Sequence, residues 1–214
     1  MLTRLKHISR WTPLALCSLL CAALLVACGG TTGSSTSTTS STSTTSSAST
    51  VPPSSTSTSA SMTALAGNGF TISYPQGLQL SRSGSRLIIL TDSTGMIKMT
   101  IAIVLNPNGV ISADSLVNTA IKAQKVRLKN VQTESVPPTV TVGGASWSQQ
   151  SVSGTQRLNA ANVAIQSVAL ANVHPGNTLT SKSYTIVYSA PKSMFSQANT
   201  TFFQPILQSF KFQP

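Results

Sequence analysis

The residue with the most clearly defined covalent chemistry is Cys28, which ends an apolar run and stands directly before glycine, serine and threonine. Leu25, Val26 and Ala27 precede it and complete a bacterial lipobox, in which small residues give the signal peptidase access and the thiol accepts diacylglycerol through a thioether bond. Each acyl methylene buried in a bilayer contributes roughly 0.8 kcal/mol, so two or more chains anchor a protein stably. We therefore expect a mature chain that begins at lipidated Cys28.

Residues 1–27 have the layout of an export signal. Three cations and no acid lie in the first ten residues, and a mostly apolar stretch over 11–27 follows them. This stretch is shorter than the about 20 apolar residues of a membrane span, and a proline interrupts it. The lipoprotein interpretation places the chain on the extracytoplasmic face of the cell membrane, or on an outer membrane where the cell has one. The alternatives are a secreted protein cut after Ala27 with a free thiol, and a short uncleaved anchor.

Few other side chains are suited to chemistry. After removal of the signal the chain keeps one cysteine, three acids and one histidine, namely Cys28, Asp92, Asp114, Glu134 and His174. One thiol cannot form a disulfide framework, a zinc cluster or a redox pair, and acid–base catalysis needs titratable groups that converge on one pocket. The many serines occur without a nucleophile elbow, and no glycine-rich phosphate loop precedes a helix. We expect no catalytic residue, no metal site and no cofactor, and therefore not an enzyme.

Positive charge dominates the composition, with a formal net charge of +11. Three of these charges leave with the export signal, and the others are thinly spread apart from one cluster formed by Lys122, Lys125, Arg127 and Lys129. Outside the cytoplasm such a cluster suits anionic lipid headgroups or acidic envelope polymers, and we expect no nucleic-acid partner. The alternative is a solvated basic face that aids solubility.

Two segments of different composition follow the signal. Residues 28–62 consist mainly of serine, threonine and glycine without any charge, which predicts a disordered tether with a root-mean-square span on the order of 30 Å. Residues 63–214 carry the periodicity of a globular domain and are numerous enough to form a hydrophobic core. The tether would let this domain stand clear of the bilayer.

The periodicity of the domain predicts several strands. Alternating residues predict strands over 70–75 and 97–105, and the apolar run over 86–92 predicts a strand that is covered on both faces. Further strands are expected over 139–142, 145–153, 162–173 and 181–190, the first two of which form a hairpin at Gly143 and Gly144. Trp147 is expected to anchor the core or its rim.

Two helical segments are predicted as well. Ser112 can cap a helix, Asp114 suits the positive end of its dipole, and one stripe can pack on the sheet: Leu116, Val117, Ala120, Ile121 and Gln124. The closing segment over 194–212 has helical spacing of Phe195, Ala198, Phe202, Ile206 and Phe210. Because Pro205 lacks a backbone N–H, we expect that helix to be short or kinked.

Three motifs resemble those of the PsbP-like family, which has the Mog-type fold and includes small bacterial lipoproteins of the LpqN type. They are "GFTISYPQGL", "GGASW" and "SYTIVYSAPKSMF" running on to "FFQPILQSFKF", and together they cover residues 66–214. The resemblance implies an α+β fold with a central, largely antiparallel sheet sandwiched by helices, and a final Ser-Phe-x-Phe strand. Members serve mainly in docking, assembly or ligand binding, and the resemblance brings no catalytic residues.

The leading hypothesis is a lipid-anchored, extracytoplasmic binding or scaffold module without catalysis, which docks a protein or envelope partner. A second hypothesis is a carrier or receptor for a small apolar or anionic ligand, with a pocket between the sheet and the helix and the basic cluster near its mouth. A hydrolase that uses one of the many serines is a third.

Overall fold

The computed structural model describes residues 61–82, 85–158 and 160–214. The predicted export signal, the lipobox with Cys28 and nearly all of the predicted tether lie outside these residues. The strands are β1 (Met62–Ala66), β2 (Phe70–Pro75), β3 (Leu78–Arg82), β4 (Leu87–Asp92), β5 (Lys98–Leu105), β6 (Lys129–Glu134), β7 (Thr139–Val142), β8 (Ala145–Leu158), β9 (Ala161–His174), β10 (Lys182–Pro191) and β11 (Lys211–Phe212). The α-helices are α1 (Ala113–Arg127), α2 (Phe195–Ala198) and α3 (Gln204–Ser209).

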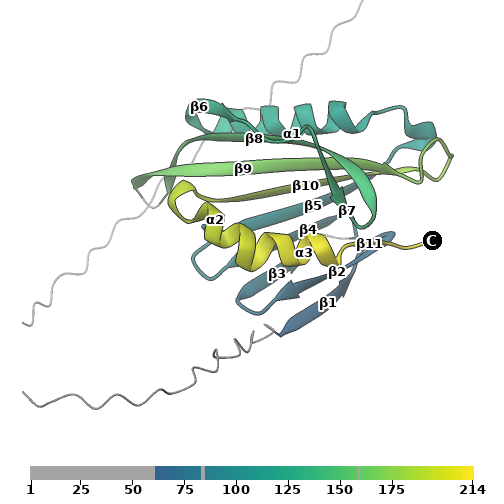
Figure 1. Ribbon diagram of the computed structural model, residues 1–214, viewed down its shortest axis with the longest axis horizontal. Helices are drawn as coiled ribbons and strands as arrows, with labels where there is room; N and C mark the ends of the chain where they lie inside the picture. The colour runs from purple at the N-terminus through teal and green to yellow at the C-terminus, as the bar shows by residue number, and fades with distance from the viewer. Residues whose placement is uncertain (1–60, 83–84, 159) are drawn as a thin grey trace, which may run out of the picture. The chain divides into compact units, whose positions relative to one another are not determined.

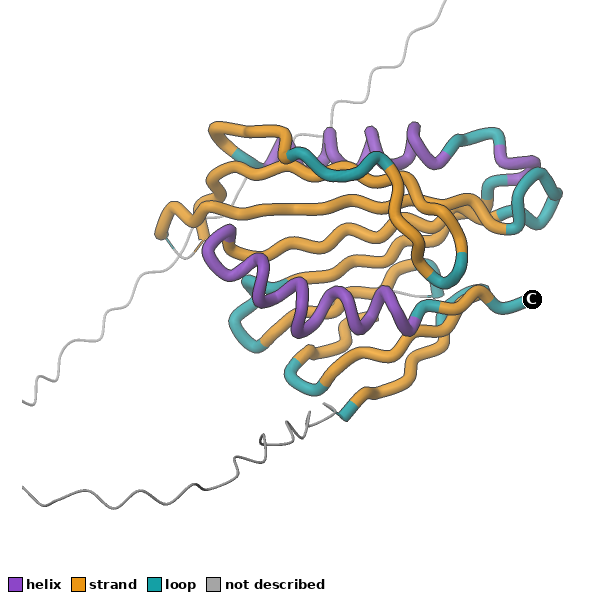
Figure 2. Tube along the Cα trace, viewed as in Figure 1, coloured by secondary structure: helices purple, strands orange, loops and turns teal. Residues whose placement is uncertain are grey.

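Two antiparallel sheets organise these strands (Figures 1 and 2). The larger sheet has the order β3-β4-β5-β10-β9-β8-β6, and β7 pairs with β8 outside this path. The smaller sheet has the order β1-β2-β11, so the last strand of the chain pairs with one of the first. The predicted α+β class with a largely antiparallel sheet is confirmed, and so is the final strand that the resemblance implied.

Helices cover both faces of the larger sheet, as expected (Figure 1). On one face α1 buries Val117 and Ile121 against small and branched side chains of β8 and β9. On the other face α2, α3 and the smaller sheet enclose the main core, whose largest fully buried side chains include Trp147, Tyr184 and Phe203. Because successive strand residues point to opposite faces, one strand such as β9 supplies Val168 and Leu170 to the main core and Ala169 to the α1 side.

Helix α1 forms where its sequence signals predict it. Ser112 has an extended backbone, and its side chain accepts a hydrogen bond of 3.2 Å from the backbone N–H of Ser115. Lys125 and Arg127 occupy the last turn, where cations suit the negative end of the helix dipole. None of the described helices has the length and hydropathy of a membrane span.

The closing helical segment differs from its predicted stripe by one residue. Between α2 and α3 the residues Asn199–Phe203 form a π-helical turn, in which the Gln204 N–H donates to the Asn199 carbonyl five residues earlier. A π turn inserts one extra residue into the helical repeat, so Phe203 rather than Phe202 follows Ala198 into the core. The interruption stands directly before Pro205, whose ring and missing N–H disfavour a regular helix there.

Candidate functional site

One predicted feature of β4 is wrong, and the error locates a groove. Residues 86–92 were expected to be covered on both faces, but only Ile88 and Leu90 are buried, whereas Leu87 and Ile89 are half-buried. The reason is the position of α1, which packs on β8, β9 and β10 and does not extend over β4. One face of β4 and of the adjoining part of β5 therefore remains open beside the helix.

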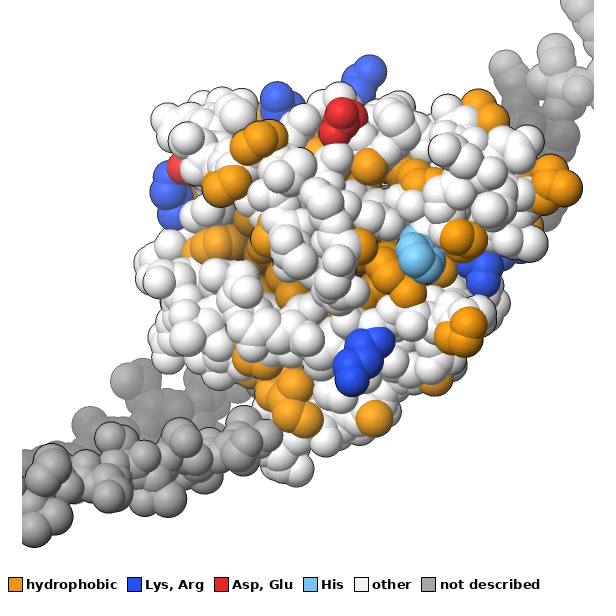
Figure 3. Space-filling model, turned by 45° about the vertical axis from the view of Figure 1, so that its right-hand side comes forward, with side chains coloured by type: hydrophobic (Ala, Val, Ile, Leu, Met, Phe, Trp, Pro, Cys, Tyr) orange, Lys and Arg blue, Asp and Glu red, His pale blue; other side chains and the backbone are white. Residues whose placement is uncertain are grey.

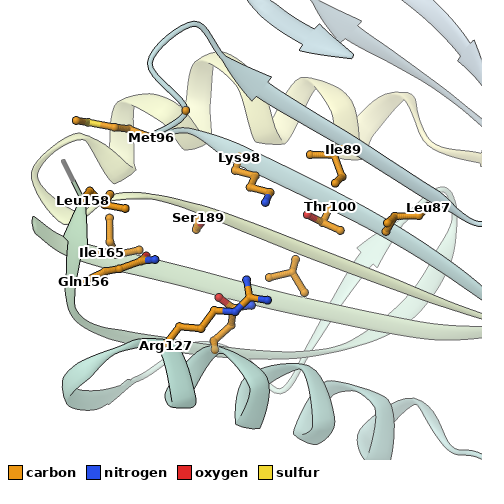
Figure 4. A pocket seen from close by; sticks show the side chains of 13 residues that line it. Leu87, Ile89, Met96, Lys98, Thr100, Arg127, Gln156, Leu158, Ile165 and Ser189 are labelled. Carbon is orange, nitrogen blue, oxygen red and sulfur yellow. The ribbon is translucent and has the colours of Figure 1, made fainter. Parts of the chain in front are cut away.

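This opening is a groove of about 490 Å³ between α1 and the sheet (Figure 4). Its apolar lining comes from five places in the chain and consists of Leu87, Ile89, Met96, Leu158, Ile165 and Val187. Neutral polar side chains stand among them, contributed by Thr100, Gln124, Gln156 and Ser189. The mixture can contact both an apolar chain and a polar head of a bound molecule.

Two cations complete the lining, Lys98 from β5 and Arg127 from the last turn of α1. Figure 4 shows their side chains pointing into the groove from opposite sides. Among the residues that the structure describes, neither charged group has a hydrogen-bond or ion-pair partner, and no described acid lines the groove. A concave site with charge of one sign concentrates ligands of the opposite sign.

The predicted basic cluster is only partly associated with this groove. Lys122, Lys125, Arg127 and Lys129 are all exposed, on the second half of α1 and at the start of β6. Arg127 alone lines the groove, because it lies on the side of the helix that faces β4 and β5. Lys98 was missed as a site residue, since alternation in 97–105 showed only that it points away from the core.

The three acids and the histidine each contact different partners. Asp92 accepts hydrogen bonds in the β4–β5 turn, Asp114 accepts one from the Ser148 hydroxyl, and Glu134 pairs with Lys192. Burial raises the pKa of Asp92, but hydrogen bonds from the Thr94 side chain and nearby backbone N–H groups outweigh it and hold that pKa below its ordinary value. No group of three or more metal-ligating side chains occurs within the described ranges.

His174 belongs to an aromatic cluster. Its ring stacks on Phe212 with a centroid distance of 3.9 Å and an interplanar angle of 13°. Phe212 also contacts Trp147 and Tyr184, so the histidine covers one margin of the main core. Burial raises the pKa of Tyr184, and more strongly that of Tyr188, to about 12. The aromatic cluster, including His174, therefore forms part of the core packing.

Acid pH should weaken the ion pair between Glu134 of β6 and Lys192, which follows β10. The Lys192 ammonium lies 2.6 Å from the Glu134 carboxylate, and hydrogen bonds from Lys192 and Ser153 lower the pKa of Glu134. A lowered folded-state pKa gives stability above the ordinary value of 4.5, and this stability is lost as pH falls through the lowered pKa.

In urea unfolding, the Glu134→Gln variant should be less stable than the unchanged chain at pH 7. The two stabilities should converge as the solution is acidified, because both side chains are then neutral. A difference that stays constant with pH would show that the ion pair contributes nothing.

Comparison with known proteins yields structural likenesses only. No protein-family profile and no curated protein matches the chain. LpqN of Mycobacterium tuberculosis, described as involved in cell envelope biogenesis, has 17% sequence identity and a TM-score of 0.45 over 72% of this chain and 91% of that one. A protein of Bacteroides thetaiotaomicron has 8% identity and a TM-score of 0.41 over 68% of this chain and 46% of its own.

These likenesses carry no activity or site over to this chain at such identities and TM-scores. LpqN gives its name to the LpqN type with which the sequence motifs were compared. The PsbP-like part of that resemblance stays a prediction.

Proposed function

We propose that this protein is a lipid-anchored, extracytoplasmic module that binds a small anionic ligand without catalysis. The observation that carries the proposal is the groove beside α1, in which Lys98 and Arg127 lack partners within the described part of the chain. Unpaired cations in a partly apolar groove favour a ligand that brings the missing negative charge. The lipobox at Cys28 supports attachment to the membrane.

The chemistry of the lining suggests two parts in the ligand. A phosphate or carboxylate would receive charge-assisted hydrogen bonds from the guanidinium of Arg127 and the ammonium of Lys98. An apolar portion would contact Leu87 and Ile89, which are half-buried and belong to an otherwise uncovered face of β4. Thr100 and Ser189 offer neutral hydrogen-bonding groups in the same groove.

The scattered acids and the packed histidine support a role without catalysis. Asp114 and Glu134 each engage a neighbouring hydroxyl or ammonium, and His174 stacks in the core margin rather than beside the groove. No acid–base pair therefore faces the proposed ligand among the described residues. Docking of a protein or an envelope polymer, the leading hypothesis from the sequence, stays a prediction.

Native mass spectrometry of the purified protein tests the ligand. We expect a bound anionic molecule that leaves when Lys98 and Arg127 are both changed to glutamine. A chain that shows no bound molecule and does not bind added decyl phosphate would contradict ligand binding in the groove.

Fractionation of cells tests the anchor separately. The unchanged protein should stay with the membranes, whereas the Cys28→Ser variant should be released. A Cys28→Ser variant that remains tightly in the membrane fraction would overturn the lipid anchor. The proposal of ligand binding in the groove would be unaffected.

A further inference from the structure

We propose that an apolar tip at one end of the larger sheet docks on an anionic bilayer surface. The apolar tip consists of the exposed side chains Val104, Leu105, Val110, Ile111 and Leu179. Its position is independent of the groove, but its access to the bilayer rests on the proposed lipid anchor.

Hydrogen bonds join the segments that form the apolar tip. The backbone N–H of Asn106 donates to Ser181, and that of Asn108 donates to Thr178, which ties the loop after β5 to the loop before β10. The Asn106 side chain donates to the Ile111 carbonyl at 2.8 Å and accepts from the Ile111 N–H at 3.0 Å. The five side chains are thus presented by one connected end of the sheet.

The apolar side chains protrude strongly. Val110 is 81% exposed and Leu179 is 77% exposed, and Figure 3 shows hydrophobic side chains at this end of the domain near the histidine. The other exposed large hydrophobic residues lie on separate elements, at Met62, Leu80, Val126, Val131 and Met194. Scattered residues of that kind are ordinary, whereas a cluster at one end indicates a contact surface.

Positive charge accompanies the apolar tip. Arg86 is exposed, and its carbonyl accepts from the Ile103 N–H beside Val104. Lys182 pairs with Leu105 across the β5–β10 ladder. The acid nearest in sequence, Asp114, has its carboxylate engaged by Ser148. An apolar protrusion flanked by cations complements the headgroups and the upper acyl region of an anionic leaflet.

A bilayer fits this surface better than a second protein does. A stable protein interface buries about 800 Å² on each partner and draws on aromatic and arginine anchors. Five aliphatic side chains, each partly covered, provide less apolar area than that and include no aromatic ring.

The predicted tether is long enough for this docking. Lys182 donates to the Asn68 side chain at 3.0 Å, so the end of β1 near Ala66 lies beside the tip. The start of β1 at Met62 is therefore on the order of 20 Å away along the strand. The tether predicted from the sequence, with an expected span on the order of 30 Å, would close this distance and allow the tip to face the leaflet that holds the proposed anchor.

Fluorescence labelling tests the proposal on residues 28–214 with Cys28→Ser, so that no acyl chain contributes. Leu179→Cys then supplies a single thiol for an environment-sensitive dye, and Val126→Cys is the matched control because Val126 is 83% exposed on α1. With phosphatidylglycerol vesicles, the dye at residue 179 should shift to shorter wavelength and be quenched by lipid-phase quenchers, while the dye at residue 126 should not. Equal responses at both positions would overturn the proposal.

Vesicle flotation with variants identifies the contact. We expect Val110→Asp combined with Leu179→Asp to weaken partition into the same vesicles about tenfold, and Lys122→Gln combined with Lys125→Gln to change it little. If only the changes at Lys122 and Lys125 weaken partition into the vesicles, the basic face of α1 contacts the bilayer and the apolar tip does not. If the chain dimerises without vesicles and the aspartate variant is monomeric, a second copy occupies the tip and the bilayer proposal fails.

Discussion

Changing Lys98 and Arg127 together to glutamate should abolish the affinity of the groove for an anionic ligand. The two cations line one groove from opposite sides, and neither has a partner among the described residues. A hydrogen bond to a charged group contributes about 1.5–3 kcal/mol, and the new carboxylates would also repel the ligand. We therefore expect the dissociation constant for decyl phosphate to rise about 100-fold or more in isothermal titration calorimetry.

The matched control changes Lys122 and Lys125 to glutamate. This pair makes the same change in net charge and, like Arg127, lies on α1, but neither residue lines the groove. We expect at most a small, salt-sensitive effect on the binding of decyl phosphate, because exposed charges outside the site act only at long range. If both pairs of changes weaken binding equally, the overall positive charge of the domain attracts decyl phosphate and the groove has no specific role.

Changing Trp147 to alanine should cause the largest loss of stability in the domain. The side chain is fully buried, and its ring meets Phe210 edge-on at 5.2 Å and stacks with Phe212 at 6.0 Å. Its Nε1–H donates to the Val142 carbonyl at 3.1 Å within the β7–β8 hairpin. Truncation removes these contacts and leaves a large cavity, which costs about 3–5 kcal/mol.

Urea unfolding followed by circular dichroism measures this loss. Trp147→Phe serves as the control, because it retains an aromatic ring in the core and removes the indole hydrogen bond to Val142. We expect a smaller loss for this variant, about 1–2 kcal/mol. Equal stabilities of Trp147→Ala and the unchanged chain would mean that the hairpin does not depend on this anchor.

Most secondary structure was predictable because it depends on local periodicity. Strict alternation located β2 and β5, and the cap at Ser112 with its apolar stripe located α1. β6 was missed because five of its six residues are exposed and its register shifts between Lys129 and Gln132, so it carries no alternation. The π turn was missed because helical spacing alone cannot show where an extra residue enters.

The candidate site was predictable only in part. The sequence alone indicated a cationic group at Arg127 and a pocket between helix and sheet. It did not indicate Lys98, because a cation on the polar face of a strand has the same sequence pattern whether it faces solvent or a groove.

The sequence by itself determined the chemistry available to this protein, namely few acids, an excess of cations and a cysteine in a predicted lipobox, and its periodicity located strands such as β2 and β5 and the helix α1. The tertiary structure decided which of those groups meet. Lys98 and Arg127 share one groove because the antiparallel order places β5 near the centre of the sheet, while α1 packs on β6, β8, β9 and β10 and leaves β4 open. Long-range strand order and the coverage of a sheet face arise from packing of the whole domain, and no local pattern encodes them.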